Sequence, residues 1–247
     1  MSNVKVLYED NHIIVVFKPA GVLSQGDKTG DVSMYDMVKD YIKETKAQKF
    51  QRNFVLGRAL NALSALEYKK TGNVFLGLIH RLDRPVSGIM LFAKTSKGAS
   101  RLSEQFINHT IEKNYHALVI GKPNSNKGVL INKLGKDSKL LKAKNYLDGV
   151  EVKLYYEVVK SNEIYSLLKI KIEGGKFHQI RAQLSIAGFP ILGDIKYKGG
   201  SWDNKEAIAL CATELSFKAA TEEKIINLAI GLPKEWKNYL STESLDL

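Results

Sequence analysis

The sequence favours an α+β fold built mainly from strands. Short β-prone runs recur along the whole chain, and several alternate apolar with polar residues, as strands with one buried face do. Turn-forming clusters join neighbouring runs, whereas helical spacing of apolar residues is confined to a few segments. These features agree with a mainly antiparallel sheet that carries helices, although the pattern alone does not establish the topology.

The elements can be assigned in chain order. A turn cluster at Glu9-Asp10-Asn11 joins the first two strands into a hairpin, Ser96 is the expected N-cap of a helix, and Ser161-Asn162 is expected to form a two-residue turn. The basic segment 43–73 is hard to assign, although 59–66 could form a further helix. The expected helices are 33–42, 96–108, 178–187 and 233–240, and the expected strands are 4–7, 12–17, 74–79, 89–93, 113–121, 128–134, 150–160, 163–173, 207–212, 214–217 and 224–229.

The charge balance points to a polyanionic partner. Lysine and arginine number 37 against 26 aspartates and glutamates, a net charge of +11 at pH 7. Nucleic acid is the commonest soluble polyanion, although an anionic membrane surface would also attract such a chain. No apolar window is long enough to span a membrane, and no signal-peptide core is present. We therefore expect a soluble, cytoplasmic, monomeric protein without a membrane or protein partner.

The cysteine and histidine content argues against redox and metal chemistry. Cys211 is the single cysteine, which excludes an internal disulfide and a thiolate zinc cage, and its apolar surroundings predict a buried, inert thiol. The histidines lack paired metal-ligand spacing, and no Walker loop or dinucleotide fingerprint occurs. No cofactor or metal is expected.

One stretch between the apolar runs 74–79 and 89–93 is the main candidate for a functional site. It reads His80-Arg81-Leu82-Asp83-Arg84-Pro85-Val86-Ser87-Gly88, and we expect it to lie outside both flanking strands. Pro85 disfavours a helical backbone at Arg84, so Asp83 is held in a tight connection between two arginines. Loops on a rigid scaffold often carry chemistry, but the turn taken alone leaves open whether Asp83 is functional or only a turn-former.

This stretch resembles the signature of the RluA-type pseudouridine synthases, His-Arg-Leu-Asp-x-x-Thr-Ser-Gly, with Val86 in place of the threonine. Lys113-x-Tyr115 before an apolar run is similar to a second family motif, and Lys18-Pro19-Ala20-Gly21 is similar to an early Asn-Lys-Pro-Ala-Gly, with Phe17 in place of the asparagine. A third motif, Thr-Gly-Arg-x-His-Gln-Ile-Arg followed by Gly-x-Pro-Ile-x-Gly-Asp and a tyrosine, is matched at Gly175, 178–181, Gly188, Pro190-Ile191, Gly193-Asp194 and Tyr197.

The third motif departs from the family at Gly174, which replaces threonine, and at Lys176, which replaces arginine and keeps the charge without the bidentate geometry. The similarity covers almost the whole chain and is weakest over 43–73 and 136–145. Because the family's first hairpin already starts near residue 4, no room is expected for the small S4-type RNA-binding domain that many members carry. With no internal repeat or linker, a single catalytic domain is expected over 1–247.

The resemblance implies a mixed, mainly antiparallel sheet with flanking helices and an active site in a central cleft. It implies that uridine within RNA is isomerised to pseudouridine: the base is detached from C1′, turned, and rejoined through C5. Asp83 would be the catalytic aspartate, Arg181 would pair with it, and Tyr115 would lie against the uracil. Since a base in a stem must be flipped out, Arg81 is a reasonable group to enter the vacated space and contact phosphate. Ribosomal RNA is the favoured substrate and tRNA is possible.

The residues themselves suit that chemistry. Glycoside hydrolysis usually needs two carboxylates, whereas here one conspicuous carboxylate lies among arginines, as in a reaction where the released uracil is itself the returning nucleophile. Asp83 must be ionised in a cleft, and a nearby guanidinium favours that form. Attack on the sugar and attack on the base both stay open. We expect Arg181→Ala to remove activity and leave the fold largely intact.

Two other functions stay open at this point. An RNA-binding protein on the same scaffold with little or no catalysis is conceivable because Val86, Gly174 and Lys176 depart from the motifs. A basic nucleosidase is the other alternative, and it would need a second catalytic carboxylate.

Five further assignments concern residues around these motifs. Lys18 is expected to be a surface lysine or a phosphate contact, His80 and His178 are expected to be structural hydrogen-bonding residues, and Asp194 is expected to cap the turn after Gly193. A lysine-rich segment is either a solvated loop or an arm that follows phosphates, and its lysines are Lys133, Lys136, Lys139, Lys142 and Lys144.

Overall fold

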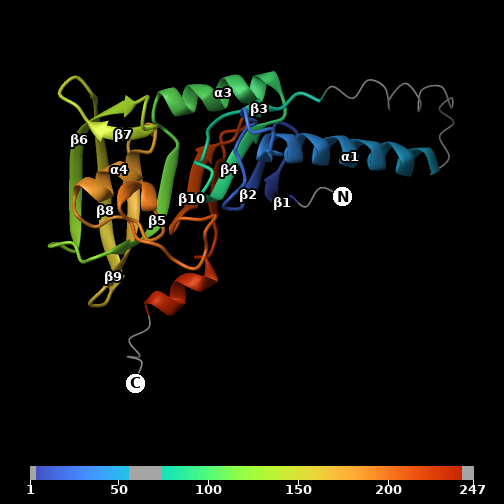
Figure 1. The fold of residues 1–247 in the computed structure, drawn as a ribbon. Helices are drawn as coiled ribbons and strands as arrows, with labels where there is room; N and C mark the ends of the chain where they lie inside the picture. Colours follow the sequence, from blue (N-terminus) through green and yellow to red (C-terminus); the bar gives the residue numbers. More distant parts are fainter. Residues whose placement is uncertain (1–3, 56–73, 241–247) are drawn as a thin grey trace.

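A computed structural model describes residues 4–55 and 74–240 (Figure 1). One sheet runs through this part of the chain in the order β1-β2-β4-β10-β5-β9-β8-β6-β7, with β3 beside β4 and β11 beside β10. Of the strand pairs in these residues, β4 with β10 is parallel and the others are antiparallel. The predicted α+β class with a mixed, mainly antiparallel sheet is confirmed.

Strands make up most of the regular structure in these residues. The strands are β1 (Lys5–Glu9), β2 (Ile13–Lys18), β3 (Gly77–Leu78), β4 (Ser87–Ala93), β5 (Glu112–Ile120), β6 (Lys127–Asp137), β7 (Lys142–Asn145), β8 (Val150–Ser161), β9 (Tyr165–Ile172), β10 (Leu210–Lys218) and β11 (Ile225–Ala229). The helices are α1 (Met34–Val55), α3 (Ser96–Ile107), α4 (Gln179–Ile186) and the 3₁₀ turns η1 (Ile195–Tyr197) and η2 (Lys234–Tyr239). Among these helices, none is long and apolar enough to cross a membrane.

Several predicted boundaries need correction. Helix α1 runs on to Val55, past the predicted end at 42, while the possible helix at 59–66 lies outside the described residues. Thr95, not Ser96, caps α3, because its Oγ1 accepts the N–H of Gly98 at 3.1 Å. The two-residue turn at Ser161-Asn162 is wrong, because Ser161 still pairs with Ser166 and the loop is 162–164. Asn162 Oδ1 accepts the N–H groups of Ile164 and Tyr165 in this loop.

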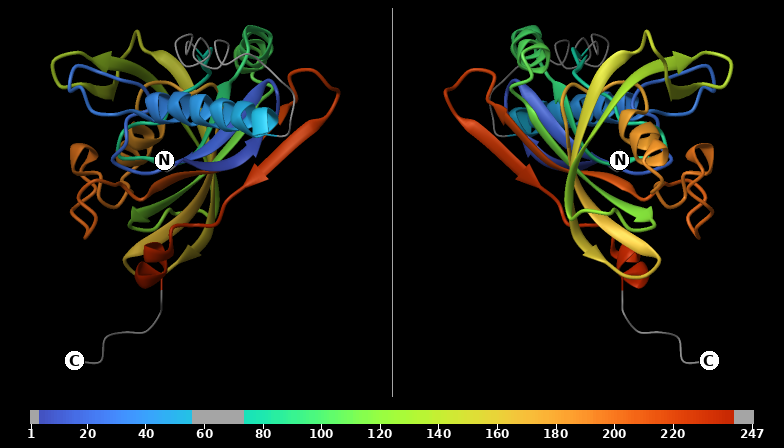
Figure 2. Two further views of the ribbon diagram at one scale, coloured as in Figure 1. Left: turned by 90° about the vertical axis from the view of Figure 1, so that its right-hand side faces the viewer. Right: turned by 90° about the vertical axis from the view of Figure 1, so that its left-hand side faces the viewer.

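Two stretches of the C-terminal half form longer elements than predicted. The lysine-rich segment is the hairpin β6–β7, in which Leu134 pairs with Asn145 and Asp137 with Lys142. The separate strands predicted at 207–212 and 214–217 form one strand, β10, and its pairing with β5 shifts register between Ala212 and Glu214. Figure 2 shows β10 and β11 projecting together from the body of the sheet.

The predicted strand at 74–79 is wrong except at Gly77–Leu78. The edge of β4 that this segment would cover is divided among three partners: β10 pairs at Ser87 and Gly88, β3 pairs at Phe92 and Ala93, and the N–H of Leu91 donates to the ring of His80 at 3.0 Å. The ring of His80 therefore replaces part of the backbone hydrogen bonding along this edge of β4. Strand β4 also begins at Ser87, so the end of the nonapeptide lies inside it, contrary to expectation.

Strands β2 and β4 are largely buried and pair with each other. The apolar residues of β2 and β4 are almost entirely buried, as in strands covered on both faces, and β2 pairs with β4 along its whole length. Helix α3 packs on β3 and β4, whereas α4 packs on β6, β7 and β8 (Figure 1). Gly88 is required where β4 meets β10, because its φ is +133° and a Cβ there would collide with the backbone of Ala212.

Candidate active site

Asp83 lies on a turn that leads directly into β4. The N–H of Val86 donates to the carbonyl of Asp83 at 3.0 Å, which closes the turn. Two N–H groups from distant segments hold the next carbonyls: Gly21 donates to Arg84 at 2.9 Å and Ile208 to Pro85 at 3.0 Å. The backbone that presents Asp83 is thus fixed from both sides.

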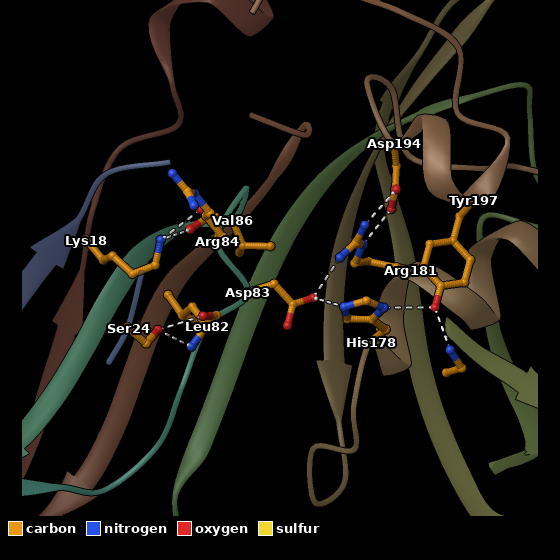
Figure 3. Close-up of polar contacts among 11 residues, drawn as sticks. Lys18, Ser24, Leu82, Asp83, Arg84, Val86, His178, Arg181, Asp194 and Tyr197 are labelled. Carbon is orange, nitrogen blue, oxygen red and sulfur yellow. Dashed lines mark hydrogen bonds and ion pairs between the residues drawn. The ribbon is translucent and has the colours of Figure 1, made fainter. Parts of the chain in front are cut away.

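Lys18 lies beneath this turn and is fully buried. Its Nζ donates to the carbonyl of Pro19 at 2.9 Å. It also donates to the carbonyls of Arg84 at 3.2 Å and Val86 at 2.8 Å (Figure 3). Burial lowers the pKa of Lys18 to about 7, against the opposing charge of Asp83. The prediction that Lys18 is a surface lysine or a phosphate contact is therefore wrong, and Lys18 instead holds the loop that carries Asp83.

Ser24 holds the same loop one residue earlier. Its Oγ donates to the carbonyl of Leu82 at 2.6 Å and accepts the N–H of Leu82 at 3.0 Å. Lys18 and Ser24 thus hold the backbone on both sides of Asp83, and this backbone sets the direction of the carboxylate (Figure 3).

The predicted pairing of Asp83 with Arg181 is confirmed. Arg181 Nη1 donates to Asp83 Oδ2 at 3.0 Å, across 98 residues of chain (Figure 3). Arg181 lies in α4, where its neighbours are also buried, so the guanidinium reaches the cleft from a packed stem.

A second carboxylate fixes the guanidinium. Asp194 is 1% exposed, and it accepts from Arg181 Nε at 2.7 Å and from Nη2 at 2.9 Å. The predicted role of Asp194 as a turn cap is wrong, because both its oxygens are bound to Arg181 and its side chain does not cap η1. Burial opposes the charge of the guanidinium, but the two aspartates outweigh it, and the pKa of Arg181 is raised.

His178 is the second side chain, after Arg181, that lies beside the carboxylate of Asp83. Its backbone is left-handed, with φ of 52°, and its Nε2 lies 3.5 Å from Asp83 Oδ2. Its Nδ1 lies 3.0 Å from the hydroxyl of Tyr197, which accepts the N–H of Ala143 at 2.7 Å. Burial lowers the pKa of His178 to about 4, so the ring is neutral near pH 7.

The cleft around Asp83 has a volume of about 710 Å³. Tyr115 lines it from β5, and its side chain is almost fully buried, with the residue 7% exposed. No hydrogen bond holds the Tyr115 hydroxyl within residues 4–55 and 74–240, and burial together with the charge of Asp83 raises the pKa of Tyr115. Tyr115 is thus a flat side chain in the wall of the cleft that Asp83 also lines, and its contact with the uracil stays a prediction.

The two arginines next to Asp83 differ in their contacts. The guanidinium of Arg84 is already bound within the protein: it pairs with Asp31 at 2.8 Å and donates to the carbonyl of Gly21 at 2.9 Å. Arg81 lines the cleft and is exposed, and no hydrogen bond or ion pair holds its guanidinium in the described part of the chain. Arg81 is therefore free to contact a ligand, as the prediction requires.

Sequence reasoning missed the contacts that other lining residues make. Lys113 donates to the carbonyl of Gly174 at 2.6 Å and lies over the ring of Phe106 at 4.9 Å, so it joins α3 to the loop before α4. His80 stacks on Phe106, and burial lowers its pKa to about 3, which agrees with the structural role expected for it. The Lys113-x-Tyr115 motif is the one feature of the sequence that draws attention to Lys113.

Comparisons with known proteins agree with this geometry. The sequence model of the RNA pseudouridylate synthase family matches residues 12–186. An uncharacterised RNA pseudouridine synthase of Bacillus subtilis, YhcT, is 27% identical over 242 residues, which cover 96% of this chain and 71% of that protein. The ribosomal large subunit pseudouridine synthase C of Rickettsia prowazekii is 30% identical over 196 residues, 78% of this chain and 55% of that protein.

Among solved structures, human RNA pseudouridylate synthase domain containing 4 superposes with a TM-score of 0.69. The two are 22% identical, and the match covers 96% of this chain and 91% of the human one, so it supports the shared fold. Together with the family match over 12–186, the fold and site define an RNA-modifying isomerase. The chain belongs to the RNA pseudouridylate synthase family, of the RluA type, and its reaction is the conversion of uridine in RNA to pseudouridine.

Proposed function

We propose that the protein isomerises uridines of ribosomal RNA, with Asp83 as the nucleophile. The observation that carries this role is the asymmetry of the carboxylate. Oδ2 is bound by Arg181, whereas Oδ1 has no hydrogen bond or ion pair in residues 4–55 and 74–240 and belongs to a side chain that lines the cleft (Figure 3). One oxygen is anchored and the other is available to react.

The reaction follows from that arrangement without water as a reactant. Asp83 Oδ1 forms a bond to the nucleotide as the bond between N1 and C1′ breaks, and the uracil takes the electron pair. The uracil turns and joins C1′ through C5 as the carboxylate leaves. The C5 proton then goes to solvent and N1 takes up a proton from solvent, which gives a neutral isomer of uridine. Attack on the base instead of the sugar would need the same free oxygen, while Arg181 holds Oδ2.

Two cleft residues are proposed to hold the everted nucleotide. Tyr115 lies in the wall beside Asp83, where stacking on a base contributes roughly 1–3 kcal/mol. Arg81 is exposed and unpaired in the described chain, and we propose that it enters the space the base has left and contacts phosphate. Flipping costs a few kcal/mol, which contacts of this kind offset.

The choice of ribosomal RNA is supported by the Rickettsia relative, which is named for the large ribosomal subunit. Four lysines of the β6–β7 hairpin are exposed, namely Lys133, Lys136, Lys139 and Lys144, and we propose that they follow RNA phosphates. We further propose that the protein acts as a monomer in the cytoplasm, which size-exclusion chromatography with light scattering and cell fractionation would test.

The test is incubation of the wild type and Asp83→Asn with unmodified ribosomal RNA and tRNA, followed by pseudouridine mapping. Conversion of ribosomal uridines by the wild type, and none by Asp83→Asn with RNA affinity retained, is expected. Asp27→Asn is the matched control, because Asp27 also lines the cleft but is exposed and its Oδ1 is bound to Thr29.

Each alternative gives a different result in this assay. Binding without conversion by the wild type would favour an RNA-binding protein with little catalysis. Release of free uracil, lost in Asp27→Asn as well, would favour a nucleosidase with two carboxylates. Conversion of tRNA alone would overturn the proposed substrate.

A further inference from the structure

A chain of hydrogen bonds connects the β6–β7 hairpin to the catalytic carboxylate. The N–H of Ala143 in β7 donates to the hydroxyl of Tyr197 at 2.7 Å, and that hydroxyl lies 3.0 Å from His178 Nδ1. On the other side of the ring, His178 Nε2 lies 3.5 Å from Asp83 Oδ2. The four residues come from β7, η1, the start of α4 and the loop before β4.

The chain of donors favours one ring nitrogen of His178 as the carrier of the proton. A backbone N–H can only donate, so the Tyr197 oxygen accepts from Ala143. The phenolic proton is then left to donate, and His178 Nδ1 is the acceptor within reach. In a neutral imidazole the other nitrogen carries the hydrogen, so Nε2–H points at Asp83.

We propose that His178, held in its Nε2–H tautomer by Tyr197, is a positioning residue that fixes Asp83 Oδ2 together with Arg181 and leaves Oδ1 to react. This inference rests on the proposed role of Asp83. The separation of 3.5 Å is longer than a hydrogen bond, and such contacts in unliganded sites shorten when the substrate is bound. The β6–β7 hairpin thereby contributes to catalysis through one backbone N–H.

The neighbours of His178 keep the ring in place. Phe177 stacks on it with ring centroids 3.8 Å apart, and Tyr197 meets it edge-on at 5.6 Å. Lys136 of β6 lies 5.1 Å from the centroid of Phe177, which makes a second contact between the hairpin and the ring. The guanidinium of Arg181 lies 5.1 Å from the centroid of Tyr197, and loss of the hydroxyl alone would leave that contact intact.

Two variants separate positioning from folding. Tyr197→Phe removes the hydroxyl and keeps the ring. His178→Asn offers a polar atom near the place of Nδ1 and tolerates the left-handed backbone, but it has nothing at the place of Nε2. His116→Asn is the control, because His116 Nδ1 also lies within hydrogen-bond distance of a hydroxyl, that of Thr213 at 2.8 Å, and His116 does not line the cleft.

The experiment combines kinetics with ¹⁵N NMR of histidine-labelled protein. We expect the Nε2–H tautomer at His178 in the wild type and a mixture in Tyr197→Phe. Single-turnover conversion should fall by about tenfold in His178→Asn, the worth of one hydrogen bond to a charged group, with the RNA Kd unchanged and His116→Asn like the wild type.

Two results would overturn the proposal: an Nδ1–H tautomer in the wild type, or wild-type conversion by His178→Asn. Thermal unfolding of each variant shows whether a loss of rate comes from loss of the fold. A wild type that converts no uridine would refute the proposed function instead, while the tautomer measurement would still decide how His178 is held.

Discussion

Replacing Arg181 with methionine separates its two carboxylate contacts. Methionine keeps an unbranched, packed stem and removes the charge. Asp194 is 1% exposed and would lose the partner of both oxygens, and breaking a buried ion pair in this way costs about 3–5 kcal/mol. The side chain of Asp83 is 29% exposed and can turn to water, so its share of that cost is small.

We therefore expect Arg181→Met to lower the free energy of unfolding by about 3–5 kcal/mol, a large part of the roughly 5–15 kcal/mol typical of a domain. This revises the expectation from sequence that the fold would be largely unaffected. The double variant Arg181→Met/Asp194→Asn removes the stranded charge and should recover about 2 kcal/mol. Neither variant should convert uridine.

The assays are urea unfolding at pH 7 and single-turnover conversion of RNA. A double variant no more stable than Arg181→Met would refute the argument from the buried pair. Turnover at the wild-type rate in Arg181→Met would refute the role of the guanidinium beside Asp83.

Four further predictions concern the cleft, the loop, pH and salt. Tyr115→Ala should slow single-turnover conversion by about 10–100-fold, since stacking is worth roughly 1–3 kcal/mol, and an unchanged rate would exclude contact with the base. Lys18→Met should destabilise the fold by about 1–3 kcal/mol in urea, because buried carbonyls lose their donor; equal stability would contradict this. Burial lowers the pKa of His80 to about 3 and of His178 to about 4, below the roughly 6.5 of a free histidine, so the unfolded chain binds more protons between pH 4 and 6.5. The free energy of unfolding should thus fall by about 1.4 kcal/mol per pH unit for each ring as pH drops through that window, and a flat profile would count against it. Replacing Lys133, Lys136 and Lys139 of the hairpin with glutamine should reduce the slope of log K against log salt in RNA-binding titrations. The expected reduction is about 0.7–0.9 for each phosphate that these lysines neutralise. A slope equal to that of the wild type would exclude the three lysines from the interface.

The sequence predicted the site best where residues belong to a family motif, and the strands best where apolar and polar residues alternate. Asp83 between arginines and Arg181 at the start of a helix could be paired from the family motifs, and the structure places them 3.0 Å apart. Alternation of apolar and polar residues predicted β8 and β9 closely, because a strand with one buried face repeats every two residues.

The errors arose where groups from different elements of the fold meet. A lysine beside a turn is normally solvated, and nothing local to Lys18 indicates that carbonyls from 66 and 68 residues away converge on it. Asp194 follows a glycine, as a turn cap often does, but its partner lies 13 residues earlier in another element. The apolar run at 74–79 has the composition of a strand, and no pattern reveals that the ring of His80 bonds to β4 instead.

The most direct test of the central claim is the release of tritium from RNA labelled at C5 of uridine, measured in a single turnover. Joining C5 to C1′ expels the C5 hydrogen, so each conversion frees one label. We expect full release with the wild type and none with Asp83→Asn, although both bind the RNA. Release by Asp83→Asn at the wild-type rate would show that this carboxylate does not perform the reaction.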